Sequence, residues 1–173
     1  YDLQNSSRTI FYKNILFPKA KFDKWCSSET TLPESIPKVE FDKNPVLNRF
    51  EHQLKLSGLN TLNTMKPDFS WSCTNIDKIK NEYNLKEYIV LFPFCSAHLN
   101  IKKWPYYNEL IELLKNKHDN KYKIVLAPGP SEIKDTKDIN AISILDNEKI
   151  LDISQLSSLI KDSSFVIAND TGP

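Results

Sequence analysis

Three short apolar runs in the second half of the sequence constrain the fold more than any other feature. The runs are IVLF at 89–92, IVLA at 124–127 and FVIA at 165–168. Apolar runs of this length, rich in β-branched and aromatic residues, are typical of strands that are covered on both faces. Stretches with apolar residues at helical spacing lie between them. Strands that alternate with helices indicate a parallel sheet with helices on its faces, and therefore an α/β fold.

The same pattern predicts an order of elements from residue 88 onward. The predicted strands are 88–92, 122–127, 141–145 and 165–168, and the predicted helices are 105–117, about 131–139 and 154–161. Pro105 stands at the first helical position, where its missing N–H costs nothing. Upstream, Asn75 is expected to cap a short helix. A longer helix is expected from Pro45 to Gly58, because its apolar residues fall on one face and glycine is a natural stop.

The first part of the chain is less regular. Residues 1–4 have the pattern of a strand end, and the polar turn at 5–8 is expected to cap a helix. Residues 59–74 have no clean period, which is typical of a connection between domains. We therefore predict two parts, 1–70 and 71–173. Because the chain begins and ends inside predicted motifs, we expect it to be a fragment of a longer protein.

The amino-acid composition limits the kinds of binding partner that we expect for this chain. Lysine and arginine number 23 against 22 aspartate and glutamate residues, and this near-neutral balance gives no electrostatic argument for nucleic acid. Contact of a local basic patch with a membrane surface stays open. Cys26, Cys73 and Cys95 are far apart and form no C-x-x-C pair, so neither a disulfide framework nor a zinc site is predicted. No apolar run is long enough to span a bilayer and no signal-peptide pattern is present, so we expect a cytoplasmic protein.

Two stretches that follow predicted strands are the strongest candidates for a binding site. They are YIVLFPFCSAHLNIKKWP at 88–105 and IANDTGP at 167–173. In an open α/β sheet, ligands lie outside the carboxyl ends of the strands, where loop amides and helix N-termini favour anions. Both stretches are therefore expected to face one phosphate-bearing ligand. Lys102, just before a predicted helix, would add a positive charge there, and the alternative is an ordinary solvated lysine.

Four short motifs follow one another at the ends of predicted strands or the starts of predicted helices. They are Ser96, Lys102-x-Trp104-Pro105, Gly129-x-x-Glu132 and Asp170-Thr171-Gly172-Pro173. In this order they resemble glycosyltransferase family 9, the heptosyltransferase family, whose members transfer heptose from ADP-heptose to the inner core of lipopolysaccharide. The resemblance implies a GT-B fold of two Rossmann-like domains. Residues 1–70 would be part of the N-terminal acceptor-side domain, and residues 71–173 part of the C-terminal domain that binds the nucleotide-sugar donor.

The resemblance also implies roles for individual residues. It places the phosphates and sugar of the donor near Ser96, Lys102, Asp170, Thr171 and Gly172, and the ribose near Glu132. It places Gln4, Ser6, Ser7 and Arg8 on the acceptor side. Besides Lys102, several of these residues have structural alternatives. Asp170, Thr171 and Gly172 would also suit an ordinary turn after a strand. Glu132 would also be favoured by the dipole of a following helix, and Ser6 or Ser7 would also serve as a helix cap.

The chain itself contains no assigned catalytic base. Inverting transfer needs a carboxylate that takes the proton of the acceptor hydroxyl. By the resemblance, this aspartate lies upstream of Tyr1 and a further histidine lies two positions after Pro173, so we expect the chain alone to be inactive. We expect no metal ion, because Lys102 and helix N-termini would replace it and the sequence shows no carboxylate cluster. The sequence does not indicate an oligomeric state.

One departure from the family pattern keeps other functions open. Many members have Pro-Gly-x-Ser after the strand at 88–92, whereas this chain has Pro93-Phe94-Cys95-Ser96. Without the glycine, the backbone has less freedom to approach a phosphate. The alternatives are a nucleotide-binding α/β domain without transferase activity and another nucleotide-sugar enzyme such as an epimerase. No G-x-G-x-x-G motif follows a predicted strand, which counts against a dinucleotide cofactor.

Overall fold

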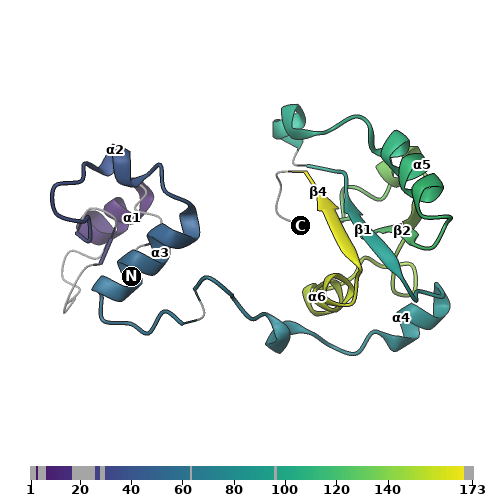
Figure 1. Cartoon of the computed structure of the whole chain (residues 1–173), viewed down its shortest axis with the longest axis horizontal. Helices are drawn as coiled ribbons and strands as arrows, with labels where there is room; N and C mark the ends of the chain where they lie inside the picture. The colour runs from purple at the N-terminus through teal and green to yellow at the C-terminus, as the bar shows by residue number, and fades with distance from the viewer. Residues whose placement is uncertain are drawn as a thin grey trace. The chain divides into compact units, whose positions relative to one another are not determined.

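The chain forms two compact units. The computed structural model describes residues 3, 7–16, 26–27, 30–62, 64–95 and 97–169. Unit 1 is Tyr1–Asp68 and unit 2 is Phe69–Pro173 (Figure 1). The division falls within the segment 59–74, for which the sequence predicts a connection. The assignment of the two parts of the chain to an acceptor side and a donor side stays a prediction.

Unit 2 is built on a parallel four-stranded sheet, as the apolar runs predict. Its strands are β1 (Tyr88–Phe92), β2 (Lys123–Leu126), β3 (Ile142–Ser143) and β4 (Phe165–Ala168). Their order is β3-β2-β1-β4, and each strand pairs in parallel with its neighbours. Ile89 of β1 pairs with Ile124 on one side and with Phe165 on the other. The chain therefore proceeds outward from β1 to β3 and returns to the other side of β1, which creates a topological switch point between β1 and β4.

Helices cover both faces of the sheet at β1, whereas the edge strand β4 is largely exposed, so the prediction that its apolar run is covered on both faces is wrong. α4 (Asp77–Glu82) and α6 (Ile153–Lys161) pack on one face, and α5 (Tyr107–Lys117) packs on the other. Successive side chains of a strand point to opposite faces. In β1, the residues that join the core of α4 and α6 are Tyr88, Val90 and Phe92, and those that join the core of α5 are Ile89 and Leu91. All five residues of β1 are buried, which explains the continuous apolar run at 89–92.

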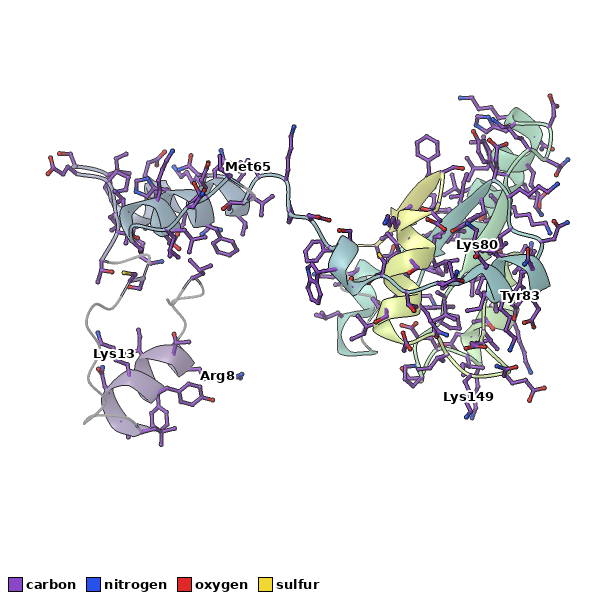
Figure 2. All side chains as sticks on the ribbon, turned by 90° about the horizontal axis from the view of Figure 1, so that it is seen from below. Arg8, Lys13, Met65, Lys80, Tyr83 and Lys149 are labelled. Carbon is purple, nitrogen blue, oxygen red and sulfur yellow. The ribbon has the colours of Figure 1, made fainter. Side chains whose placement is uncertain are left out.

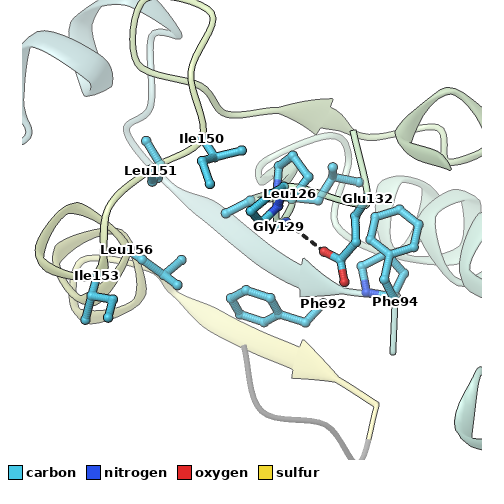
Figure 3. Close-up of a pocket in the computed structure, with 13 residues that line it drawn as sticks. Phe92, Phe94, Leu126, Gly129, Glu132, Ile150, Leu151, Ile153 and Leu156 are labelled. Carbon is cyan, nitrogen blue, oxygen red and sulfur yellow. Dashed lines mark hydrogen bonds between the residues drawn. The ribbon is translucent and has the colours of Figure 1, made fainter. Parts of the chain in front are cut away.

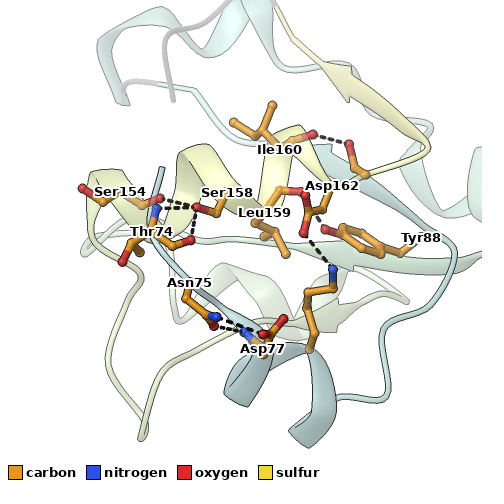
Figure 4. A network of polar contacts seen from close by, with 11 residues as sticks. Thr74, Asn75, Asp77, Tyr88, Ser154, Ser158, Leu159, Ile160 and Asp162 are labelled. Atoms are coloured by element: carbon orange, nitrogen blue, oxygen red, sulfur yellow. Dashed lines mark hydrogen bonds and ion pairs between the residues drawn. The ribbon is translucent and has the colours of Figure 1, made fainter. Parts of the chain in front are cut away.

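Hydrogen bonds fix α6 to β1 and to the start of unit 2 (Figure 4). The Tyr88 hydroxyl donates to the Leu159 carbonyl at 2.8 Å, and burial raises the pKa of this phenol. Ser158 Oγ donates to the Thr74 carbonyl at 2.6 Å and accepts the Thr74 N–H at 2.8 Å. The segment that enters unit 2 is thus tied to a helix that packs on the central strand.

The helix predicted at about 131–139 is wrong. The segment forms turns followed by a short 3₁₀ helix, η4 (Asp135–Asp138). It offers no buried apolar stripe, since Ile133 is 41% exposed, and a short helix needs a packed face to be stable. The Thr136 hydroxyl also donates to the Ile133 carbonyl at 2.8 Å, which competes with helical hydrogen bonding. The strands and the other two helices predicted from residue 88 onward lie within two residues of their predicted bounds.

Unit 1 is helical over much of its described length. α1 (Ser7–Phe11) continues into a π-helical turn, η1 (Tyr12–Leu16), and α2 (Lys38–Phe41) and α3 (Val46–Leu56) follow. α3 confirms the helix predicted between Pro45 and Gly58. Gly58 has a φ of +82°, the left-handed conformation in which glycine commonly follows a helix end. Arg49 contacts Asp42 at 3.0 Å, which joins α3 to the residue that follows α2. The predicted strand at 1–4 lies outside the described residues, apart from residue 3.

Candidate functional site

The parallel strands β1, β2 and β4 end at one edge of the sheet. Phe92 pairs with Ala168, so β1 and β4 end side by side. A cavity of about 260 Å³ lies at this edge, between the ends of β1 and β2 and the start of α6 (Figure 3). Its walls are mostly apolar and include Phe92, Phe94, Leu126, Leu151 and Leu156. A cavity with these walls suits a flat aromatic group whose faces pack against apolar side chains.

Glu132 supplies the carboxylate of this cavity. Its Oε2 accepts the Gly129 N–H at 2.7 Å (Figure 3), and its own N–H donates to the Gly129 carbonyl at 3.0 Å. These two bonds close the turn that follows β2. Because turns rather than an α-helix follow Glu132, the helix-dipole explanation of this residue does not apply. An ionised carboxylate has several acceptor positions, so one bond to Gly129 leaves capacity for ligand hydroxyls.

Phe94 stands where the resemblance implies a glycine. Its side chain is 7% exposed and lines the cavity beside Glu132 (Figure 3). The Lys103 ammonium lies 5.8 Å from the centroid of the Phe94 ring, within the range of a cation–π contact. The departure from the family pattern therefore adds an apolar wall to the cavity and places that wall against the basic stretch before α5.

The basic stretch consists of Lys102 and Lys103, between β1 and α5. Lys102 is the last residue of the 3₁₀ helix η3 (Ala97–Lys102), and both lysines are exposed. A second cavity, of about 360 Å³, is lined by Lys103, Trp104 and Tyr107 next to the first turn of α5. It shares Pro93 with the first cavity, so the two flank the end of β1. Lysine charges beside the N-terminus of an eleven-residue helix favour an anionic ligand.

Asn169, directly after β4, connects β4 to this stretch, and sequence reasoning missed it. Its Nδ2 donates to the Pro93 carbonyl at 2.8 Å, and its Oδ1 accepts the Trp104 N–H at 3.3 Å. The Tyr107 hydroxyl donates to the same Oδ1 at 3.2 Å, and burial raises the pKa of this phenol. The sequence feature that could have identified Asn169 is its position as the first polar residue after the apolar run at 165–168.

The structure places three of the predicted site residues fully. Glu132 lines the first cavity, Lys102 ends η3 on the neighbouring connection, and Arg8 projects from α1 in unit 1 (Figure 2). Ser7 begins α1, but its side chain lies outside the described part. The other predicted site residues are also outside it, so their roles stay predictions; they are Gln4, Ser6, Ser96, Asp170, Thr171 and Gly172.

Two further properties concern metal ions and membranes. Within the described part of the chain, no three side chains of histidine, cysteine, aspartate or glutamate come together as a metal site would require. Among the same residues, no helix combines the length and the apolar character needed to cross a bilayer.

Comparison with known proteins adds one match. Residues 37–173 match the family model described as glycosyltransferase family 9 (heptosyltransferase). No curated protein and no solved structure gives a significant match. The matched range begins at the residue before α2 in unit 1 and includes the whole sheet of unit 2, so it contains both cavities described above.

Proposed function

The chain belongs to glycosyltransferase family 9, and we propose that it serves the transfer of heptose from ADP-heptose to a lipopolysaccharide-core acceptor. Family membership supports glycosyltransferase activity in general, whereas the donor, the acceptor and the stereochemistry belong to the proposal. The observation that carries it is the cavity that holds Glu132, at the same sheet edge as the basic stretch before α5. A nucleotide has a flat base whose ring faces pack on apolar side chains, ribose hydroxyls that donate to a carboxylate, and phosphates that bind positive charge. Surfaces of these three kinds lie at this edge of the sheet.

In the proposal, the first cavity receives the nucleoside. Apolar walls such as Phe94 and Leu151 would cover the base, and the Glu132 carboxylate would accept hydrogen bonds from the ribose hydroxyls. The bond from Gly129 fixes this carboxylate in advance, which lowers the entropic cost of binding.

The phosphates would then lie along the basic stretch. As the acceptor oxygen bonds to the anomeric carbon, the bond from that carbon to the phosphate oxygen breaks and its electron pair leaves with ADP. Lys102 and the N-terminus of α5 would stabilise the added negative charge, so the reaction would not require a metal ion. The proton of the acceptor hydroxyl would pass to the aspartate expected upstream of Tyr1. Direct displacement of this kind inverts the anomeric centre.

The proposal also includes the acceptor substrate and the cellular location of the protein. Gln4, Ser6, Ser7 and Arg8 would contribute to the acceptor side of a GT-B enzyme. Lipopolysaccharide core is assembled on a lipid, so the protein would work as a peripheral protein at the cytoplasmic face of the inner membrane.

One observation favours a second candidate, a nucleotide-binding domain without transferase activity. Phe94 replaces the glycine that would let the backbone approach a phosphate closely. Such a domain would bind nucleotide without turning over a nucleotide sugar.

Calorimetric titration of the 173-residue chain with ADP, UDP and GDP tests the donor assignment. We expect ADP to bind about tenfold tighter than either alternative, a difference of about 1.4 kcal/mol. Equal affinities would contradict an adenine nucleotide as donor. Turnover of ADP-heptose by a chain extended to include the upstream aspartate separates the two candidates, because only the transferase releases ADP.

A further inference from the structure

We propose that Asn169 is a positioning residue that holds the phosphate-binding connection between β1 and α5 in its working geometry. The inference rests on the proposed function, since it assumes that the donor phosphates lie along the stretch containing Lys102. The inference concerns Asn169, whose side chain makes hydrogen bonds to that connection.

The side-chain amide of Asn169 joins the two ends of the connection. Nδ2 donates to the carbonyl of Pro93, the first residue after β1, at 2.8 Å. Oδ1 accepts the N–H of Trp104, which lies three positions before the start of α5, at 3.3 Å. Lys102 lies between these anchors. One planar group directly after β4 therefore fixes where the segment carrying Lys102 leaves the sheet and where it returns.

The same side chain also fixes the first turn of α5. The Tyr107 hydroxyl lies 3.2 Å from Asn169 Oδ1 and 3.4 Å from the Phe92 carbonyl oxygen, and Tyr107 is 2% exposed. The backbone N–H of Asn169 donates to that same Phe92 carbonyl at 3.2 Å. The N-terminus of α5, β1 and β4 are thus joined through one residue at the switch point of the sheet.

An asparagine suits this position because its amide both donates and accepts. Aspartate would lack the donor and would place a carboxylate oxygen against the Pro93 carbonyl. Alanine would leave the Pro93 carbonyl and the Trp104 N–H without this partner, so the connection would lose both of its bonds to residue 169. Phosphate-binding groups that are held less firmly bind more weakly, because ligand binding must then order them.

The test compares ADP with adenosine on the 173-residue chain. The dissociation constant for adenosine divided by that for ADP measures how much the phosphates strengthen binding. We expect Asn169→Ala to reduce this ratio about tenfold while the dissociation constant for adenosine changes less than about twofold. We expect Tyr107→Phe, which removes one bond to Asn169 and keeps the ring, to reduce the ratio about threefold.

Asn75→Ala is the matched control. It is the same substitution in unit 2, and it removes two side-chain hydrogen bonds, with the N–H and the carboxylate of Asp77, compared with three for Asn169→Ala. We expect it to leave the ratio unchanged although it lowers the midpoint of thermal unfolding. A merely structural role for Asn169 predicts equal losses for ADP and adenosine.

Two results would overturn the inference in different ways. If the wild-type chain binds ADP more tightly than adenosine and Asn169→Ala keeps that difference, the positioning role is wrong and the proposed function stands. If the wild-type chain shows no contribution of the phosphates, the proposed function is contradicted and the positioning role with it.

Discussion

Glu132 Oε2 lies 2.7 Å from the backbone nitrogen of Gly129 and accepts its hydrogen bond, so a turn rather than a helix presents this carboxylate to the cavity. A β-carbon at position 129 would lie 3.2 Å from the same oxygen. Glycine therefore lets the turn close on the carboxylate without displacing it. The link between these two residues gives Glu132 a fixed orientation before any ligand is present.

The first prediction separates the charge of Glu132 from its role in the turn. Glu132→Gln keeps an acceptor for Gly129 and removes the charge. Since hydrogen bonds to charged groups are worth about 1 kcal/mol more than neutral ones, we expect ADP binding to weaken about fivefold. Glu132→Ala also leaves the Gly129 N–H without this partner, and should lower the free energy of unfolding by about 1 kcal/mol. Calorimetry and urea denaturation measure the two effects, and unchanged ADP affinity in Glu132→Gln would argue against a ribose contact.

The second prediction concerns the two adjacent lysines. Lys102→Ala should weaken ADP binding about tenfold at low ionic strength and less at high ionic strength, because salt screens exposed charges. Adenosine binding should not change. Lys103→Ala is the comparison: this lysine is also exposed and lies one position further along, but its ammonium contacts the Phe94 ring. Equal losses in the two variants would indicate a general effect of positive charge instead of a specific contact by Lys102.

The third prediction uses proteolysis to monitor the connection held by Asn169. The N–H of Trp104 belongs to the peptide bond after Lys103, which trypsin recognises, and Asn169 Oδ1 accepts that N–H. Asn169→Ala should therefore speed cleavage at this bond, because cleavage requires local opening of the segment. Cleavage after Lys115 in α5 serves as the control within the same molecule. A uniform increase at both sites would indicate global loss of stability.

The fourth prediction concerns alkaline pH. Burial raises the pKa of the Tyr88 phenol above its usual value of 10.0, so the folded state keeps a proton that the unfolded state releases. This contribution to stability is complete below pH 10.0 and is lost as the pH rises through the folded-state pKa. The free energy of unfolding, measured by urea denaturation, should therefore be constant in this respect up to about pH 10 and fall as the pH rises further.

Tyr88→Phe provides the comparison. It loses the bond to the Leu159 carbonyl and should be less stable by about 1 kcal/mol near neutral pH. Its further fall at alkaline pH should be smaller than that of the wild type, and Tyr107 should contribute to what remains because burial raises its pKa as well. Equal falls in both proteins would mean that Tyr88 does not cause the effect.

The sequence predicts the sheet well because its strands carry their own signal. β1 and β4 have the predicted bounds because each is a continuous apolar run, although all of β1 is buried and β4 lies largely exposed at the edge of the sheet. The segment at 131–139 was misassigned because Glu132, Ile133 and Thr136 are all compatible with a helix. Its actual form depends on the bond from Glu132 back to Gly129 and on the absence of a face to bury, and helical propensity does not report either.

The candidate site was only partly predictable for a related reason. Glu132 and Lys102 were found through short motifs with residues that are close in sequence. Asn169 acts through Pro93, Trp104 and Tyr107, which lie 62 to 76 positions away along the chain. Only the order of the strands brings these residues together, and that order is not visible in any local pattern.

Residue-level mapping of nucleotide binding by two-dimensional NMR tests most directly whether unit 2 holds the donor at this sheet edge. Adenosine should shift the amide resonances of Gly129 and Leu151, which line the first cavity. ADP should shift these resonances and also those of Trp104 and Tyr107 before and within the first turn of α5. Shifts confined to other parts of the chain, or no saturable shift with either ligand, would contradict a nucleotide-sugar site at the ends of β1 and β2.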